Sequence, residues 1–426
     1  MRSSANADRV AARLRRRYAA EKRFRAYGVA AIIIALGFLT VLLASIIADG
    51  YTAFVQTEVR LSLDLDPSVI DPSGKRDRAD LSSADYAAVV HNALLARFPE
   101  ASDRAARRRL FRLISQGADL EVRKLVLADP SIIGSRREMW LPMAASVDQL
   151  IKGNMARAPE KGGQFSEREL AWIDALQADG SLKTRFNKWL FTGGDSRQPE
   201  LAGLWGAVVG SFYSLLVTLA LSFPLGVATA VYLEEFASRN RWTDLIEVNI
   251  NNLAAVPSIV FGLLGLEIFL NVFELPRSSP LVGGLVLTLV SLPTIIIAAR
   301  VSLKAVPPWI REAALGLGAS RLQMVTHHVL PLAMPGILTG TIIGMARAIG
   351  ETAPLLMIGM VAFIVDVPAT PLDPATALPV QVYLWAASPE RAFIERTSAA
   401  ILVLLCFLAA MNATAIYLRK HFERRW

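Results

Sequence analysis

The sequence has little cysteine and histidine, and this scarcity excludes several kinds of site. Cys406 is the only cysteine among 426 residues, so one chain can form neither a disulfide framework nor a cysteine metal centre. We interpret it as a small packing residue. Of the four histidines only His327 and His328 are neighbours, and we expect this pair to face the cytoplasm rather than bind an ion. No metal site is predicted.

Phosphate-binding glycine loops are also absent. The sequence contains no G-x-x-x-x-G-K-[ST] loop, so this chain cannot bind ATP in the P-loop manner. Gly316-Leu317-Gly318 lacks the third glycine of a dinucleotide-binding fingerprint. We therefore predict no nucleotide cofactor on this chain and no enzymatic activity, and any ATP-derived energy would have to come from another polypeptide.

Charged residues are scarce, at 19% of the chain against 53% hydrophobic residues. Since about 20 apolar residues span the hydrocarbon core of a bilayer, this patterning predicts an all-α polytopic membrane protein with six transmembrane helices. The first apolar run is too long for the core of a signal peptide, so we interpret it as a retained anchor. The six predicted spans are Ala26–Ala48, Leu204–Leu233, Asn252–Phe273, Leu281–Leu303, Gly336–Ile364 and Ser398–Leu418.

Basic residues flank both ends of the membrane region, in residues 1–25 and 419–426. Because cationic flanks are retained on the cytoplasmic side, both termini are predicted to be cytoplasmic. The net charge of +8 then reflects topology and contact with anionic lipid, and no nucleic-acid partner is predicted. The cations concerned are Arg13, Arg15, Arg16, Arg17, Lys22, Arg23, Arg25, Arg419, Lys420, Arg424 and Arg425.

Residues 49–203, between the first two spans, are more polar and long enough to form a compact extracytoplasmic domain. Glu58–Leu65 alternates between polar and apolar residues, which predicts a strand. Ser166 and Glu169 have the spacing of a helix capping box. These features predict an α+β insert without a nucleophile, metal or nucleotide motif, followed by a glycine-rich linker at Gly193–Ser196. Helices are predicted near Ala84–Phe98, Asp103–Ser115, Ala144–Ile151 and Ser166–Leu176.

Residues 304–335 form a polar loop before the fifth span. Pro307-Pro308 is suited to start a helix that ends at Gly316 to Gly318. A second short helix is predicted near Ser320–Val329, ending before Pro331. Such a two-helix elbow would offer a rigid protrusion to a cytoplasmic partner, whereas the plainer interpretation is a linker that contains a helix.

The fifth span has a patterned face. Gly336, Gly340, Gly344, Arg347 and Glu351 follow one another at steps of three or four residues, which places them on one side of a helix. The glycines would allow a second helix to approach closely. A charge facing lipid near mid-membrane costs at least ~2.5 kcal/mol, so both charged side chains should face protein or a water-filled path.

Three interpretations of the Arg347–Glu351 pair stay open. It could be a static ion pair, a gating pair that exchanges partners, or a contact in which Arg347 meets a passing oxyanion through two parallel hydrogen bonds. Arg300, near the inner end of the fourth span, could extend such a translocation path, although we favour a snorkelling anchor there.

Several of these residues resemble known permeases. Glu312-Ala313-Ala314, Gly318 and Leu330-Pro331 resemble the EAA signature of ABC-importer permeases, with His328 in place of an expected branched aliphatic residue. The resemblance implies that Glu312, Ala313, Ala314 and Gly318 couple the chain to an ATPase. Two further runs, Asn252–Gly262 and Arg347–Pro354, are similar to the PstA family of phosphate-specific permeases. The resemblance extends from about Leu204 to the end and omits the insert.

This resemblance implies a permease subunit of a phosphate importer in the bacterial inner membrane, with type I ABC-importer architecture. Its implied partners are a second homologous permease, two copies of an ATPase that bind ATP and Mg²⁺, and an extracytoplasmic phosphate-binding protein. Two alternatives stay open: a permease for another oxyanion, such as sulfate, molybdate or phosphonate, and a membrane-anchored sensor that would not depend on Glu312.

Overall fold

The computed structural model describes residues 2–157 and 165–422, which divide into two compact units, Met1–Asp49 and Gly50–Trp426. Helix α1 (Arg2–Gly50) makes up the first unit, and its apolar part is long enough to cross a membrane. The predicted anchor is therefore a helix. Arg424 and Arg425 of the basic tail lie outside the described residues.

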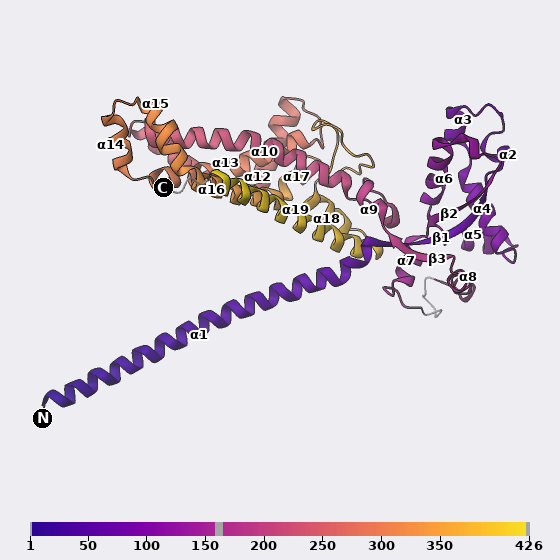
Figure 1. The fold of residues 1–426 in the computed structure, drawn as a ribbon, viewed down its shortest axis with the longest axis horizontal. Coiled ribbons are helices and arrows are strands. Elements are labelled where there is room, and N and C mark those ends of the chain that lie inside the picture. The colour runs from indigo at the N-terminus through magenta and orange to yellow at the C-terminus, as the bar shows by residue number, and fades with distance from the viewer. Residues whose placement is uncertain (1, 158–164, 423–426) are drawn as a thin grey trace. The chain divides into compact units, whose positions relative to one another are not determined.

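The insert is built on a three-stranded antiparallel sheet in the order β2-β1-β3 (Figure 1). The central strand β1 (Val55–Asp64) contains the predicted alternation, and Val59, Leu61 and Leu63 are all buried. The edge strands β2 (Arg136–Pro142) and β3 (Leu182–Phe186) were not predicted. Their side chains are mostly exposed, so they lack a strong apolar period.

Helices pack against this sheet and complete the α+β insert. The predicted helices are confirmed, and Ser166 and Glu169 form the predicted capping box of α8. Helix α6, which packs against α4 and β2, was missed. The helices of the insert are α2 (Pro67–Ile70), α3 (Arg78–Ser83), α4 (Tyr86–Arg97), α5 (Arg104–Phe111), α6 (Gly117–Ala128), α7 (Ala145–Ile151), α8 (Glu167–Ala178) and α9 (Lys188–Thr192).

The segment Gly193–Ser196 is packed rather than a free linker. A Cβ added at Gly194 would overlap the carbonyl oxygen of Val365, so the backbones approach too closely for any other residue. The indole N–H of Trp385, in helix α18 (Leu378–Ala386), donates to Asp195 Oδ1 at 2.9 Å. Burial raises the pKa of the Asp195 carboxyl.

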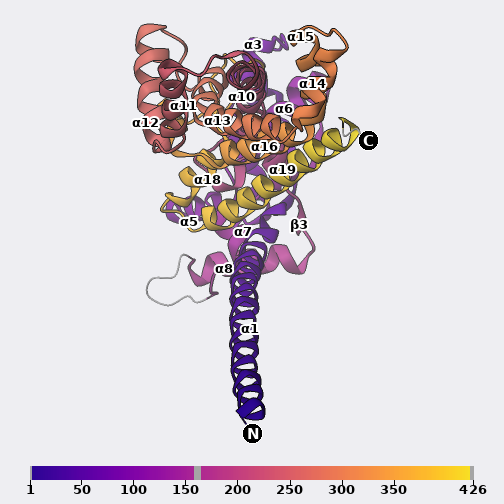
Figure 2. The same ribbon diagram turned by 90° about the vertical axis from the view of Figure 1, so that its left-hand side faces the viewer.

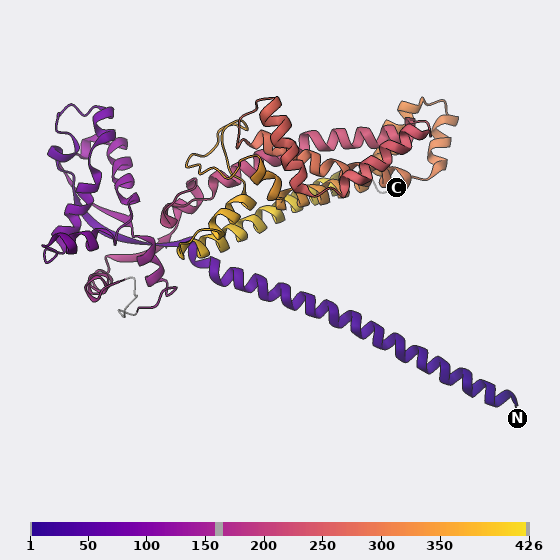
Figure 3. The same cartoon turned by 180° about the vertical axis from the view of Figure 1, so that it is seen from behind.

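Four long helices run side by side and form the membrane core (Figures 1 and 3). They confirm the second, fourth and sixth predicted spans, and the fifth in part. With α1, five described helices are long and apolar enough to cross a membrane. The four helices are α10 (Trp205–Val231), α13 (Pro280–Lys304), α16 (Leu330–Gly350) and α19 (Ala392–Phe422).

The predicted third span, Asn252–Phe273, is not a single helix in the structure. Helix α11 (Arg241–Ala254) is followed by α12 (Ser258–Gly265) and a π-helical segment η5 (Leu266–Val272), and the axis bends by 102° between them. Pro257 lies at the break, where its missing N–H and its ring end the first helix. The described residues contain six spans only if this bent pair counts as one.

The boundaries of the fifth span also differ from the prediction. Helix α16 ends at Gly350, and Pro354 belongs to a separate short helix, α17 (Ala353–Met357). At the other end, the second elbow helix does not stop before Pro331. It continues from α15 (Arg321–Met324) through a π-helical segment, η6 (Val325–Val329), into α16, because the wider π turn accommodates a proline without ending the helix.

The predicted close approach of a helix to the glycine face is confirmed. Gly336 faces Ser302 of α13, and Gly344 faces Ile295, whose Cγ1 would be 3.4 Å from an added Cβ. At Gly340 an added Cβ would overlap the Ala298 methyl group. Helices α13 and α16 therefore pack nearly backbone to backbone.

We expect Gly340→Ala to destabilise the membrane core, because overpacking of a close contact costs about 1–3 kcal/mol. Thermal unfolding in detergent should show a lower melting temperature for this variant. Gly350→Ala is the control on the same helix, since nothing lies within 4 Å of an added Cβ there. Equal melting temperatures for the two variants would contradict the packing argument.

Candidate functional site

The elbow is a compact two-helix structure whose signature residues divide between its core and its surface. Helix α14 (Pro308–Gly316) starts at the predicted proline pair, and Gly318 reverses the chain with φ +87°. Ala314 is buried against Met324 and Val329, whereas Glu312 and Ala313 are exposed. Ala314 therefore helps to hold the elbow together, and Glu312 lies on its surface. Figure 2 shows the two elbow helices, α14 and α15 (Arg321–Met324), next to each other.

The exposed side of the elbow is unusually apolar. Leu317 is 90% exposed, and Trp309 and Leu322 are exposed by 66% and 63%. Large apolar side chains gathered on one exposed structure are typical of a protein interaction surface. Next to them, His328 is also exposed, so the departure from the EAA pattern lies on the surface of the elbow.

Arg311 fixes the elbow to the membrane helices. Its guanidinium donates to Glu235 Oε1 at 2.7 Å and to the carbonyl oxygens of Leu303 and Val306 at 2.9 and 2.7 Å. Glu235 belongs to η4 (Tyr232–Phe236), the π-helical end of α10. The elbow, η4 and the end of α13 therefore meet at the Arg311 side chain, which is next to Glu312 in the sequence. A movement of the elbow would act directly on α10 and α13.

Arg300 is not the snorkelling anchor that the sequence suggested. It is only 9% exposed, and its Nε donates to Glu234 Oε1 at 2.6 Å. It also pairs with Glu247 of α11, and Lys304 lies 3.4 Å from the same Glu234 oxygen. Two carboxylates close enough to pair account for its burial, since a buried guanidinium is stable only when paired. Arg300 thus joins α13 to η4 and α11.

Arg347 and Glu351 lie together, as their spacing predicted, with 3.4 Å between Arg347 Nε and Glu351 Oε1. The Arg347 side chain is half exposed in this single chain, whereas the glycines of the same helix are covered by α13. The guanidinium therefore lies outside the α13–α16 contact and has open donor positions.

The two runs that resemble the PstA family, Asn252–Gly262 and Arg347–Pro354, contact each other in the structure. Helix α12 packs against α17, and a Cβ added at Gly262 would be 2.7 Å from the Pro354 Cα. The bend after α11 is what brings α12 to this position. Glu351 lies just before α17, so the polar pair and the bent segment belong to the same region of the membrane core.

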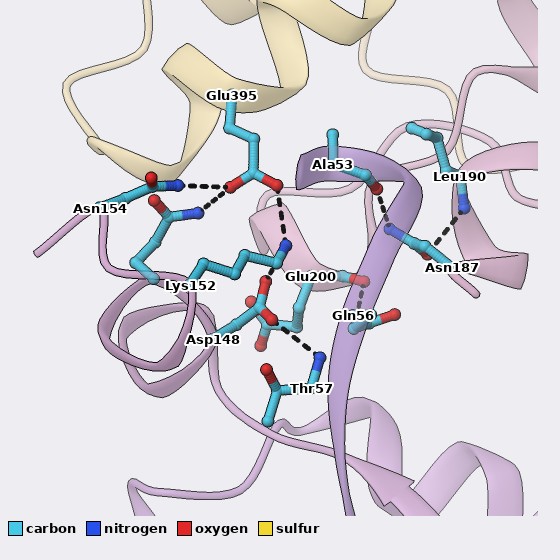
Figure 4. A network of polar contacts seen from close by, with 11 residues as sticks. Ala53, Gln56, Thr57, Asp148, Lys152, Asn154, Asn187, Leu190, Glu200 and Glu395 are labelled. Atoms are coloured by element: carbon cyan, nitrogen blue, oxygen red, sulfur yellow. Dashed lines mark hydrogen bonds and ion pairs between the residues drawn. The ribbon is translucent and has the colours of Figure 1, made fainter. Parts of the chain in front are cut away.

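A second polar site joins the insert to the last membrane helix (Figure 4). Lys152 Nζ lies 2.6 Å from Asp148 Oδ2 and 2.7 Å from Glu395 Oε1, and all three side chains are 3–4% exposed. Asp148 lies in the first turn of α7, Lys152 directly follows that helix, and Glu395 lies in the first turn of α19.

Hydrogen bonds complete this junction. Gln149 and Asn154 donate their side-chain amides to Glu395, and the backbone N–H of Thr57 donates to Asp148 Oδ1 at 2.8 Å. Every charged group in the Asp148–Lys152–Glu395 triad therefore has an opposite charge and at least one further partner, which makes its burial tolerable.

Glu200 extends the junction toward β1. Its carboxylate accepts from the Ser115 hydroxyl at 2.8 Å, and its carbonyl oxygen accepts from the Gln56 side chain at 2.9 Å. Burial raises the pKa of the Glu200 carboxyl. Glu200 thus links β1 to Ser115 within the insert.

Sequence reasoning missed this network. Glu395 and Arg396 are adjacent charges at the start of the last apolar run, and both are buried. Charges in that position suggest a buried partner, but the partners, Asp148 and Lys152, lie more than 240 residues earlier. Nothing in the spacing of those residues connects them to α19.

Comparisons with known proteins cover both halves of the chain. Residues 222–426 match the family described as binding-protein-dependent transport system inner membrane component. Residues 11–160 match a domain of unknown function, DUF3333. The DUF3333 match includes most of α1 and much of the insert.

Individual relatives are permeases. The chain is 32% identical over 223 residues to phosphate transport system permease protein PstA 1 of Mycobacterium tuberculosis (strain CDC 1551 / Oshkosh), which covers 52% of this chain and 72% of the relative. It is 30% identical to phosphate transport system permease protein PstA of Haemophilus influenzae, and this match covers 55% of this chain and 81% of the relative. It is 37% identical to the probable ABC transporter permease protein YqgI of Bacillus subtilis, and this match covers 36% of this chain and 52% of the relative. Among solved structures, an inward-facing MetNI methionine ABC transporter chain matches with a TM-score of 0.41 and 17% identity, covering 52% of this chain and 95% of that one.

We expect Lys152→Met to destabilise the junction, because it leaves Asp148 and Glu395 buried without their shared cation. Breaking a buried ion pair in this way costs about 3–5 kcal/mol. Thermal unfolding in detergent should show a large drop in melting temperature, and the insert should become more sensitive to protease. Lys75→Met, at an exposed lysine of the insert, is the control. If both variants unfold at the wild-type temperature, the triad does not hold the insert to α19.

Proposed function

Because this chain belongs to the PstA family of phosphate transport system permeases, we propose that it is the transmembrane subunit of an ATP-driven phosphate importer. The observation that carries the proposal is the identity of 32% over 72% of the length of PstA 1 from Mycobacterium tuberculosis. The family is one of transport permeases, not enzymes. In the proposed importer ATP and Mg²⁺ bind to a separate ATPase, and this chain forms half of the translocation path.

The elbow supports the proposed coupling to that ATPase. Glu312 and the exposed Trp309, Leu317 and Leu322 offer a mixed polar and apolar surface for docking. Arg311 would then transmit movement of the elbow to the ends of α10 and α13. Docking at a rigid elbow suits an alternating-access cycle, in which closure of the ATPases opens the membrane helices.

The half-exposed Arg347 supports pairing with a second, homologous permease. A guanidinium in an apolar span is costly against lipid, so its open side would face the partner permease or the path between the two subunits. In that position it could hold a gate through Glu351 or donate to phosphate oxygens. Its exposure favours both roles over that of a static ion pair, which would be fully covered.

The orientation of the proposed subunit follows from its basic flanks. Both termini and the elbow would lie in the cytoplasm, and the insert would lie outside the bacterial inner membrane, where a soluble phosphate-binding protein delivers the substrate. The basic residues of α1 before its apolar stretch, such as Arg23 and Arg25, would meet the anionic inner leaflet.

The proposed function is tested by uptake of labelled phosphate at low external concentration. Cells that lack this chain and any redundant phosphate importer should lose uptake, and expression of the chain should restore it. Restoration of sulfate, molybdate or phosphonate uptake instead would contradict the assignment of phosphate. Normal phosphate uptake without the chain would exclude it from the importer.

We expect Glu312→Lys to uncouple ATP hydrolysis from transport, because the charge reversal weakens docking of the elbow without touching its core. Phosphate uptake by cells should fall, while the purified ATPase retains its basal hydrolysis and separates from the permease on gel filtration. Asp244→Lys, an exposed charge reversal in α11 on the same predicted side, is the control and should transport normally. Full uptake with Glu312→Lys would remove this residue from the coupling surface.

A further inference from the structure

Helix α5 of the insert carries a row of arginines that the proposed transport function does not use. The side chain of Asp103 caps the helix by accepting from two backbone N–H groups, and Ala106 and Leu110 bury its inner face. The outer face, about 12 Å of helix, carries exposed arginines and the small side chain of Ala105. The exposed members of the row are Arg104, Arg107, Arg108, Arg109 and Arg112.

Two hollows adjoin this row. The smaller, of about 440 Å³, is lined by four of the arginines together with Ala105. The larger, of about 1150 Å³, shares Arg108 and Arg112 with it and continues past Gln149 and Asn154 to the segment Pro389–Ala392. That segment contains Arg391 and leads directly into α19. We call these two hollows together the arginine groove.

The positive charge of the groove is only partly compensated. Arg112 lies 3.2 Å from Glu169, which is itself held by Ser166. Glu200 and Glu390 also line the larger hollow, but the Glu200 side chain is buried and its carboxylate already accepts a hydrogen bond from Ser115.

His91 adds no charge to the groove near neutral pH. It lines the larger hollow and stacks on Phe111 with 3.8 Å between ring centroids, and burial lowers the pKa of its imidazole. A ligand would therefore meet the guanidinium groups of Arg104, Arg108 and Arg109, together with the exposed side chains of Arg391 and Glu390 at the far end of the larger hollow.

The extent of the groove fits a protein surface better than a single small anion. A phosphate ion is held by a few donors that converge on one point, whereas these arginines are spread along a helix and two hollows. Guanidinium groups match carboxylates in bidentate geometry, and opposite charges spread over two surfaces fix the register of a complex. An acidic protein segment has the matching shape and charge.

We infer that the arginine groove docks a carboxylate-rich surface of the soluble protein that delivers phosphate to the importer. This inference rests on the proposed function, which places such a protein on the same side of the membrane as the insert. An occupant of the larger hollow would touch both the insert and the segment before α19. Because Lys152 of the insert pairs with Glu395 of α19, a protein docked on the insert could displace the last membrane helix.

The test uses Arg104→Glu with Arg108→Glu, a double variant that leaves the Arg112–Glu169 pair intact. Lys75→Glu with Arg78→Glu makes the same change in net charge at two exposed residues of the insert outside the groove. Arg104→Lys with Arg108→Lys retains the charge. Each full-length chain is reconstituted in lipid nanodiscs and titrated with a fluorescent octaglutamate peptide at low and high salt, and each is tested for phosphate uptake in cells.

We expect the groove variant to bind the peptide about tenfold more weakly than wild type and to lose most uptake at low phosphate, since charge reversal at a docking surface chiefly slows association. The Lys75/Arg78 variant should resemble wild type in both assays, and the lysine variant should retain most binding. Wild-type binding should weaken as salt rises. Equal uptake by the two charge-reversed variants would overturn the inference.

Two further outcomes separate this inference from the proposed function. If wild type fails to restore phosphate uptake, the proposed function fails, and selective loss of peptide binding in the groove variant would still support an acidic-protein site. If inorganic phosphate displaces the peptide far better than sulfate at equal ionic strength, the groove is a phosphate site, and docking of a protein is excluded.

Discussion

A charge removed from water beside apolar helices is stable only with an opposite charge and hydrogen bonds around it. Three cations in this structure satisfy that requirement by joining elements that are distant in sequence. Arg300 connects α13 to η4 and α11, Arg311 connects the elbow to α10 and α13, and Lys152 connects the insert to α19. Because removing one partner leaves the other charge buried alone, each joint is expected to hold or to break as a unit.

The adjacent carboxylates Glu234 and Glu235 illustrate how local backbone geometry serves these joints. Glu234 pairs with Arg300 of the membrane core, and Glu235 pairs with Arg311 of the elbow. Both lie in η4, a π-helical turn at the end of α10. π turns are rare and are frequent at functional positions. Here one such turn directs two neighbouring charges to two different elements, so that a shift of the elbow and a shift of α13 are both transmitted to the same end of α10.

The sequence predicted elements whose signals are local. The alternation in β1, the capping box of α8, the proline start of α14 and the glycine face of α16 each depend on residues within one or two turns, and each is found in the structure. The bend at Pro257 was not predicted, and the prediction that the second elbow helix ends before Pro331 was wrong, because whether a proline ends a helix depends on the surrounding packing. Asp148 and Lys152 have i,i+4 spacing, but Glu395 lies 243 residues after Lys152, so nothing local in the sequence joins it to that pair.

The junction at Glu395 also ties the insert to the membrane core. A domain on a flexible tether would leave α19 unaffected by whatever the domain binds. Here Gln149, Lys152 and Asn154 of the insert all contact one carboxylate in the first turn of α19. Helix α19 in turn packs against α16, the helix that carries Arg347 and merges with the elbow. The insert, the last span and the elbow are therefore connected by packed helices and paired charges.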